Sequence, residues 1–241
     1  MISFYVTYWL LGIIVLPGLL LGIYAQARVH SAYKEMSQIK TKKGITANQI
    51  AREVLDSNQL DNIVLTTTED TLGDNYNPEN ETISLSPGVN NQSTISSVGI
   101  ALHEVGHAIQ DKEGYAFAKV RRFLVPVINL CSTALWPLII IGVIFNFGGS
   151  SDSIVGDIFM WAGVVFFGLS IIFSLITLPT EIDASKRAMR VLKNGDYLDS
   201  EELQGVKKVL SAAAWTYVAS LLVAILNFAR FLLTILILRR D

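Results

Sequence analysis

Apolar and polar residues follow one another along this chain in long blocks. The first block, residues 2–24, is almost wholly apolar and carries no charge. A helix of about 20 apolar residues crosses the roughly 30 Å hydrocarbon core of a bilayer. Two further apolar blocks, 123–147 and 158–178, are joined by a short loop, and a fourth begins at Ala212. The pattern predicts a mainly α integral membrane protein with about four transmembrane helices.

Basic residues indicate how these helices are oriented. Lys and Arg follow the first block and flank the central pair of blocks, whereas the loop inside that pair, residues 148–157, has none. Cytoplasmic segments are enriched in Lys and Arg. We therefore expect the polar regions in the cytoplasm and the loop outside. The first block has no basic segment before it and no clear cleavage site after it, so we expect an uncleaved anchor.

The polar region after the first block has the pattern of a small α+β unit. Thr46 is a good N-cap for a helix over 47–56. Residues 62–68 and 82–86 have the composition of strands, and 74–80 is rich in turn formers. We expect a β-hairpin followed by a helix. If the second strand is an exposed edge, a substrate peptide could add to it as a further strand; the hairpin could equally be structural.

The helix expected next carries the sequence HEVGH at residues 103–107. Positions i and i+4 share a helix face, so His103 and His107 can bind one metal ion from the same side. Zinc accepts imidazole nitrogens, keeps a position for water and lowers the pKa of that water to about 7. Glu104 can take the proton and pass it to a leaving amine. This is the H-E-x-x-H arrangement of zinc peptidases.

Features around this sequence support a helix with a functional face. Residues 90–94 offer N-caps and Gly114 offers a stop. Gly99 and Gly106 lie on the histidine face, where we expect them to leave room for a metal and a substrate chain. The other interpretation, an amphipathic helix with two surface histidines, does not explain why two of the three histidines in the chain lie here.

A catalytic zinc of this kind needs a third protein ligand. His30 lies directly after the first apolar block, and Glu113 is only six residues beyond His107. Glu181 is the better candidate, because a hairpin of the two central apolar blocks could return it to the side of the HEVGH helix. Glu181 could also be only an acidic residue in the first turn of a helix that Thr180 caps after Pro179.

Residues 103–110, HEVGHAIQ, together with 179–185, PTEIDAS, resemble the YugP-type membrane zinc metallopeptidases and, more distantly, the HtpX and CAAX-prenyl-protease group. The resemblance implies a minigluzincin-like α+β catalytic core with one Zn²⁺ per chain. It assigns Glu181 as the third ligand beside His103 and His107, and Glu104 as the catalytic base. The distant group usually has Asp where this chain has Ser185, so a hydroxyl would have to support the ligand histidine there.

These features predict a membrane-embedded zinc endopeptidase of a bacterial plasma membrane, with its site on the cytoplasmic side and a protein or peptide as substrate. Membrane lipid is the other expected partner; the 19 basic and 21 acidic residues do not favour nucleic-acid binding. The expected segments are a transmembrane helix over 2–25, a catalytic region over 26–122, a transmembrane hairpin over 123–179, cytoplasmic helices over 180–211 and a C-terminal membrane helix over 212–241.

Two points stay open. Tyr76, Asn75 and Arg187 are candidates by chemistry for stabilising the charge that develops on the scissile carbonyl oxygen. The alternative function is a non-enzymatic membrane scaffold or sensor with a structural zinc, for which His30 could supply a fourth ligand. A pseudo-protease is less consistent with the sequence, because Glu104 is present.

Overall fold

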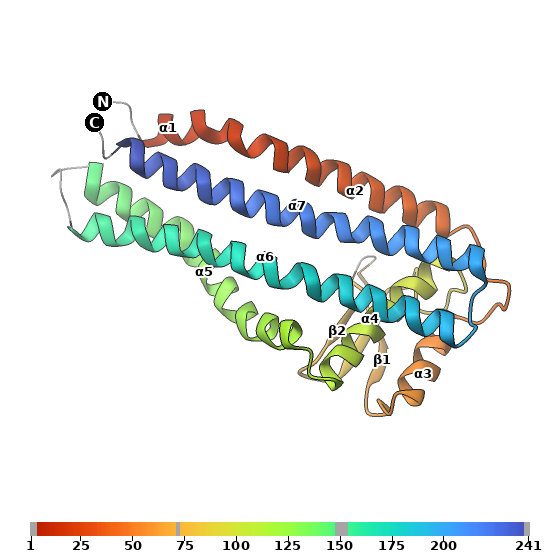
Figure 1. The fold of residues 1–241 in the computed structure, drawn as a ribbon. Coiled ribbons are helices and arrows are strands. Elements are labelled where there is room, and N and C mark those ends of the chain that lie inside the picture. Colours follow the sequence, from red (N-terminus) through yellow and green to blue (C-terminus); the bar gives the residue numbers. More distant parts are fainter. Residues whose placement is uncertain (1–3, 71–72, 148–153, 239–241) are drawn as a thin grey trace. The chain divides into compact units, whose positions relative to one another are not determined.

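The structure is a computed structural model that describes residues 4–70, 73–147 and 154–238. Its elements are, in order, α1 (Phe4–Leu10), the 3-10 helix η1 (Leu11–Val15), α2 (Leu16–Met36), α3 (Ala47–Ser57), β1 (Val64–Thr67), β2 (Asn75–Asn77), β3 (Thr82–Leu85), α4 (Ile95–Lys112), α5 (Ala116–Phe147), α6 (Ile154–Asn194) and α7 (Ser200–Leu238) (Figure 1). The chain forms two compact units. A helical unit comprises Met1–Tyr24, Val120–Leu178 and Tyr217–Asp241, and a mixed unit comprises Ala25–Lys119 and Pro179–Thr216.

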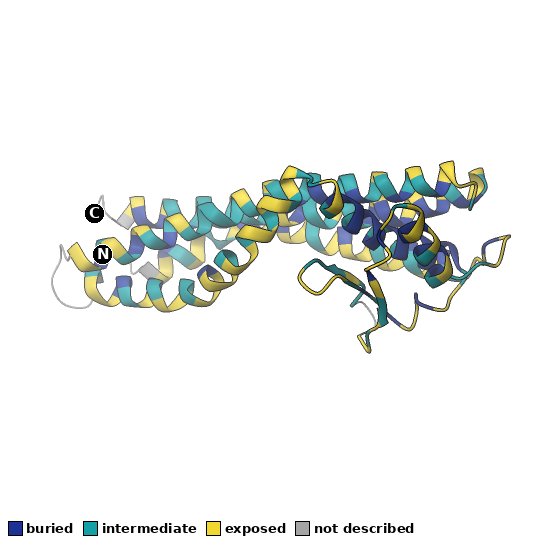
Figure 2. Ribbon diagram, turned by 90° about the horizontal axis from the view of Figure 1, so that it is seen from below, coloured by how far each residue is buried: buried dark blue, intermediate teal, exposed yellow. Residues whose placement is uncertain are grey.

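Among the described residues, four helices are long and apolar enough to cross a membrane. They cover Tyr5–Met36, Ala116–Asn146, Ile154–Asn194 and Ser200–Ile237. Large apolar side chains point outward from them, such as Trp9 and Phe123, which are 75% and 73% exposed. Figure 2 shows exposed positions along these long helices. Continuous apolar surface on long helices is what a bilayer covers, so the expected membrane architecture is confirmed.

Two of the long helices extend further than the apolar blocks do. α6 continues through Pro179 to Asn194, so the expected start of a new helix at Thr180 is wrong. Proline has a helical φ and removes only one donor, and membrane helices tolerate it where neighbouring groups satisfy the freed carbonyl. α7 runs without a break from Ser200 to Leu238, joining the polar and apolar segments expected on either side of Ala212.

The N-terminal helix also extends beyond its apolar block. It changes from α to 3-10 geometry at Leu11–Val15 and ends at Met36. Pro17 lies in the first turn of α2, where the missing proline N–H costs little. The polar residues between position 24 and Met36 therefore continue the same helical segment.

The mixed unit contains three strands, one more than expected, in the order β1–β3–β2. β1 and β3 are the two expected strands, but they pair in parallel, from Val64 opposite Thr82 to Thr67 opposite Leu85. β2 lies in the segment expected to be a turn and pairs antiparallel with β3, so β2 and β3 form the hairpin. In this order β2 is an edge strand.

The core of the mixed unit surrounds α4. Five residues spaced along this helix are fully buried: Val98, Ala101, Leu102, Val105 and Ala108. They belong to one cluster with apolar side chains of α3 and β3, including Ile50, Leu55, Ile83 and Leu85. Each fully buried Val, Leu or Ile side chain contributes about 1.5–3 kcal/mol. α4 is therefore held rigidly by its neighbours, and polar side chains on its remaining face have defined positions.

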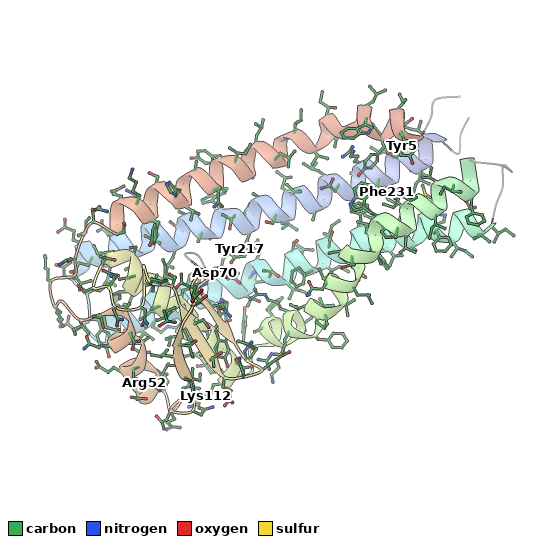
Figure 3. All side chains as sticks on the ribbon, turned by 180° about the vertical axis from the view of Figure 1, so that it is seen from behind. Tyr5, Arg52, Asp70, Lys112, Tyr217 and Phe231 are labelled. Carbon is green, nitrogen blue, oxygen red and sulfur yellow. The ribbon has the colours of Figure 1, made fainter. Side chains whose placement is uncertain are left out.

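The helical unit has a smaller core of its own. Phe231 of α7, labelled in Figure 3, is fully buried and packs with Ile139, Val143, Met160 and Ile235. A Cβ on Gly163 would lie 2.9 Å from the Phe231 ring, so a glycine at this position allows the ring to approach α6. Small residues that let helices approach closely are common in membrane helix packing.

Candidate metal centre

Local signals define both ends of α4, the helix that carries the HEVGH sequence. The Thr94 side chain accepts a hydrogen bond from the Ser97 N–H, and the Ser97 hydroxyl accepts one from the Thr94 N–H. This reciprocal capping box satisfies two N-terminal donors. At the other end Gly114 has a φ of +67°, the left-handed conformation that ends many helices. The caps expected from the sequence are thus confirmed.

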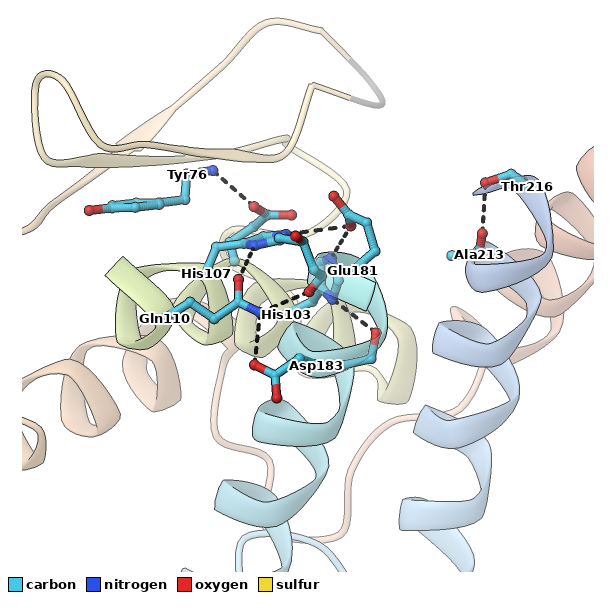
Figure 4. A network of polar contacts seen from close by, with 11 residues as sticks. Tyr76, His103, His107, Gln110, Glu181, Asp183, Ala213 and Thr216 are labelled. Atoms are coloured by element: carbon cyan, nitrogen blue, oxygen red, sulfur yellow. Dashed lines mark hydrogen bonds and ion pairs between the residues drawn. The ribbon is translucent and has the colours of Figure 1, made fainter. Parts of the chain in front are cut away.

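Three predicted ligands converge. His103 and His107 lie one turn apart on α4, and Glu181 enters from α6. The Glu181 Oε2 atom is 3.1 Å from His103 Nε2 and 3.5 Å from His107 Nε2. One possible ligand atom from each residue lies within 4.8 Å of the other two. Figure 4 shows Glu181 reaching both imidazole rings. Among the described residues, this is the group of His, Cys, Asp and Glu side chains that could hold a metal ion.

Glycine at position 106 allows α4 and α6 to pack this closely. A Cβ on Gly106 would lie 2.5 Å from the Ala184 carbonyl oxygen, and a Cβ on Gly99 would lie 2.9 Å from Val206 of α7. The expectation that these glycines leave room for a metal and a substrate chain is therefore wrong. Neighbouring helices fill that space, and the contact of Gly106 with Ala184 places Glu181, one turn earlier on α6, beside the histidines.

Each imidazole also forms a hydrogen bond through its Nδ1 atom to a neutral side chain. His107 Nδ1 lies 3.0 Å from the Gln110 amide oxygen, and His103 Nδ1 lies 3.2 Å from the Ser185 hydroxyl. Hydrogen bonds at Nδ1 fix the ring orientation and direct Nε2 of each histidine toward Glu181. Ser185 therefore supplies the hydroxyl support that the sequence left uncertain.

Gln110 was not predicted from the sequence. Its side chain is fully buried, and its amide nitrogen donates to the Thr180 carbonyl oxygen at 2.8 Å and to Asp183 at 2.9 Å. Figure 4 shows Gln110 between His107 and Asp183. The available signal was its spacing, because a residue three positions after His107 lies on the same helix face. Gln110 thus links His107 on α4 to the segment of α6 that carries Glu181.

Glu104 is buried and faces the sheet. Its Oε2 atom accepts the main-chain N–H of Tyr76 at 2.8 Å. Tyr76 stands opposite Ile83 in the β2–β3 ladder, yet its N–H bonds to Glu104, so this N–H points away from β3. The outer edge of β2 therefore runs beside the carboxylate, an arrangement that could not be expected while this segment was assigned to a turn.

Asp74 fixes the start of β2. Its carboxylate accepts the N–H of Ser86 at 2.7 Å and the Ser86 hydroxyl at 3.1 Å. Burial, and in addition the charge of Glu104, raise the pKa of Asp74 above its ordinary value of 3.8, although the bonds from Ser86 oppose this. Asp74 therefore joins the two ends of the β2–β3 hairpin close to Glu104.

The remaining candidates have other partners. The Tyr76 hydroxyl donates to Asp111 at 3.1 Å. Arg187 binds Asp183 through Nε and Glu113 through Nη1, both at 2.5 Å, so Glu113 pairs with an arginine and is not in the metal-ligand group. His30 is exposed on α2, also outside that group.

Comparisons with known proteins decide the family. A family model described as "Putative neutral zinc metallopeptidase" matches residues 11–236. The chain is also 35% identical over 216 residues to the "Putative membrane protease YugP" of Bacillus subtilis (strain 168), which covers 90% of this chain and 92% of the relative. The chain belongs to the neutral zinc metallopeptidase family. No solved structure matches it.

Membership of this metallopeptidase family implies Zn²⁺ as the cofactor, and the donor set fits that ion. Two imidazole nitrogens and one carboxylate oxygen are a common set for catalytic zinc. Tetrahedral bonds of about 2.0–2.1 Å place ligand atoms about 3.3 Å apart. The two distances from Glu181 to the imidazoles, 3.1 and 3.5 Å, bracket that value. All three ligand atoms lie within 4.8 Å of one another, so the two imidazole nitrogens would move closer together when the ion binds.

The electrostatic surroundings of this metallopeptidase site also favour a cation. Burial disfavours the protonated imidazole of His107, but the hydrogen bond to Glu181 and the charge of Glu104 outweigh it, so the pKa of His107 is raised. A positive charge between these groups is therefore stabilised. A bound metal ion provides such a charge and leaves the imidazoles neutral, as ligands must be.

Proposed function

We propose that this membrane zinc metallopeptidase is an endopeptidase of the gluzincin type, in which His103, His107 and Glu181 hold the zinc and Glu104 is the catalytic base. The observation that carries the proposal is the convergence of Glu181 from α6 on the two histidines of α4, at 3.1 and 3.5 Å. When bound, zinc supplies an acidified water and a Lewis acid for the scissile carbonyl.

The chain provides the proton transfers. Glu104 follows His103 directly on a rigid, buried helix, so its carboxylate has a defined position beside the metal ligands. As general base it takes a proton from the attacking water, and as general acid it returns one to the leaving amine nitrogen. Gln110 and Ser185 keep the imidazoles oriented during these steps through their bonds to Nδ1.

The edge strand β2 is a suitable surface for an extended substrate. A peptide that pairs with the outer edge of β2 extends the sheet by one strand and passes beside Glu104. The N–H of Tyr76 now donates to Glu104. A substrate carbonyl that accepts this N–H instead releases one carboxylate oxygen for the water. Substrate binding and activation of the base are then coupled through one main-chain donor.

The distribution of Lys and Arg supports a site on the cytoplasmic side of the membrane. The substrates proposed for this site are membrane proteins or their membrane-proximal segments. The alternative is a scaffold with a structural zinc, which usually has four protein ligands and for which His30 could supply the fourth. His30 is exposed and lies outside the metal-ligand group among the described residues, so no observation favours that function.

The test compares wild type with Glu104→Gln in detergent, using a mixed-sequence peptide library as substrate and mass spectrometry to detect new ends. The amide keeps the shape of the carboxylate and can accept the Tyr76 N–H, but it cannot act as the base. We expect equal zinc content and loss of cleavage by a factor of about 100 or more. Full cleavage by Glu104→Gln at wild-type zinc content would contradict the assignment of the base.

A further inference from the structure

Arg230 is a charged residue in an otherwise uncharged part of α7. Residues 209–229, between Lys208 and Arg230, include no Asp, Glu, Lys or Arg, and the next charged residue is Arg239. The first residues of this stretch, Val209, Leu210 and Ala212, lie in the core of the mixed unit, and the helical unit resumes at Tyr217. Arg230 is eight residues, or about 12 Å, before the end of α7 at Leu238. The long side chain of an arginine near the end of a membrane helix can extend to the headgroup layer.

The guanidinium of Arg230 is held in place by the N-terminal helix. Its Nε–H donates to the main-chain carbonyl of Tyr8 at 2.9 Å. Its central carbon lies 3.6 Å from the centre of the Tyr8 ring and 6.0 Å from that of Trp9. A Cβ on Gly12 would lie 3.4 Å from Nη2, so the absence of a side chain there leaves space for the group. The arginine is therefore preorganised, with one of its five donors used.

No carboxylate neutralises this arginine within residues 4–70, 73–147 and 154–238, where the polar and cation–π contacts of its guanidinium are with the Tyr8 carbonyl and the two rings. A charge that leaves water without a partner is costly, and arginines in membrane helices are normally paired or reach the interface. The Tyr8 carbonyl and the rings compensate only part of the charge, so the site is suited to an anion from outside the protein.

The aromatic residues around Arg230 indicate the same level in the membrane. Trp9 is 75% exposed, and the rings of Tyr8 and Trp136 make an edge-to-face contact with centres 6.3 Å apart. Tyr and Trp are enriched where a membrane protein meets the headgroup layer, because their rings are apolar and their tips are polar. The position of Arg230 along α7 and its aromatic neighbours are thus two independent observations that place it near the headgroup layer.

We propose that Arg230, together with Tyr8 and Trp9, binds the phosphate of a phospholipid headgroup at the membrane face toward which α7 ends. The planar guanidinium offers a pair of N–H groups that matches two phosphate oxygens. Tyr8 holds the cation in position, and the exposed ring of Trp9 packs against the glycerol and upper acyl chain. This lipid site is independent of the proposed peptidase reaction.

The test measures the thermal unfolding midpoint of the full chain in detergent while phosphatidylglycerol is added. Diacylglycerol with the same acyl chains and inorganic phosphate are added in parallel samples. For wild type we expect phosphatidylglycerol to raise the midpoint by about 5–10 °C at a hundredfold excess over its Kd. Diacylglycerol and inorganic phosphate should leave it unchanged. An equal rise with diacylglycerol would overturn the role of the phosphate, and an equal rise with inorganic phosphate would overturn the lipid assignment.

Three variants separate this site from a general effect of charge. Arg230→Gln should abolish the rise with phosphatidylglycerol. Arg122→Gln, which removes an arginine from another helix of the helical unit, should keep it. Arg230→Lys keeps the charge without the planar donors and should need more lipid for the same rise, which covers the case that Arg230→Gln does not fold. Equal responses of the Arg230 variants and wild type, or equal losses in Arg122→Gln and Arg230→Gln, would overturn the proposal.

Discussion

Replacing Gly106 with alanine tests whether the contact between α4 and α6 sets the metal site. The new Cβ would lie 2.5 Å from the Ala184 carbonyl oxygen, where an ordinary contact is at least 3.4 Å. The backbone carbonyl cannot rotate away like a flexible side chain, so the helices must separate by about 1 Å. Overpacking of this kind costs about 1–3 kcal/mol of stability.

The same displacement of the helices should weaken zinc binding more than it lowers stability. Ala184 is one turn from Glu181, so separating the helices moves the Glu181 carboxylate away from the two histidines. Zinc–oxygen bonds are about 2.0–2.2 Å long and tolerate deviations of about 0.2 Å. A shift of about 1 Å therefore removes this ligand. We expect the zinc affinity of Gly106→Ala to fall by a factor of about 100 or more, by analogy with the 10- to 100-fold losses from weaker disturbances.

The assay is a competition for zinc against a chelator of known affinity, together with thermal unfolding of the metal-free proteins. Gly99→Ala is the matched control. Gly99 lies on the same helix as Gly106, and its new Cβ would also be crowded, at 2.9 Å from a side-chain atom of Val206. This contact is with α7 and not with the segment that carries Glu181. Both variants should lose stability, and only Gly106→Ala should lose zinc affinity. Wild-type zinc affinity in Gly106→Ala, or equal losses in the two variants, would refute the reasoning.

Two further predictions concern the groups around the site. Gln110→Ala removes the hydrogen-bond partner of His107 and two hydrogen bonds to α6, so zinc affinity should fall about 10- to 100-fold in the same competition assay. Ser185→Ala removes only the hydrogen bond to His103 and should lower zinc affinity less. A larger loss in Ser185→Ala than in Gln110→Ala would contradict these roles. Because the pKa of Asp74 is raised above 3.8 in the fold, the native state binds more protons than the unfolded state between 3.8 and the higher folded pKa. Stability contributed by Asp74 is therefore complete below pH 3.8 and is lost as pH rises through the folded pKa. Asp74→Asn should flatten this part of the curve of unfolding free energy against pH, and an unchanged slope would show that Asp74 is not responsible.

Features that depend on local sequence could be predicted. The spacing of His103 and His107 determines that they share a face of any helix, and Thr94 and Gly114 are suited to its ends whatever surrounds them. The third ligand needed more than local information. Its position after the central apolar pair made Glu181 a reasonable candidate, and resemblance to a family strengthened the assignment.

Features that depend on tertiary contacts were missed. The segment around Tyr76 contains Asn, Asp and Pro, which favour turns, yet it forms β2 because β3 and Glu104 satisfy its main-chain groups. Pro179 is a reasonable helix end by itself, but α6 continues through it because the following turns pack against α4. Gln110 has no distinguishing local pattern, because its role arises only when the Thr180 carbonyl is brought beside it.

The central claim is that two histidines of α4 and one glutamate of α6 hold a single zinc ion. The most direct test is the zinc content, by elemental analysis, of purified wild type, Glu181→Ala and Glu113→Ala, where Glu113 is the nearby acid that pairs with Arg187. We predict one zinc per chain in wild type and in Glu113→Ala, and none in Glu181→Ala. Zinc retained at wild-type level by Glu181→Ala, or lost from Glu113→Ala alone, would contradict the account.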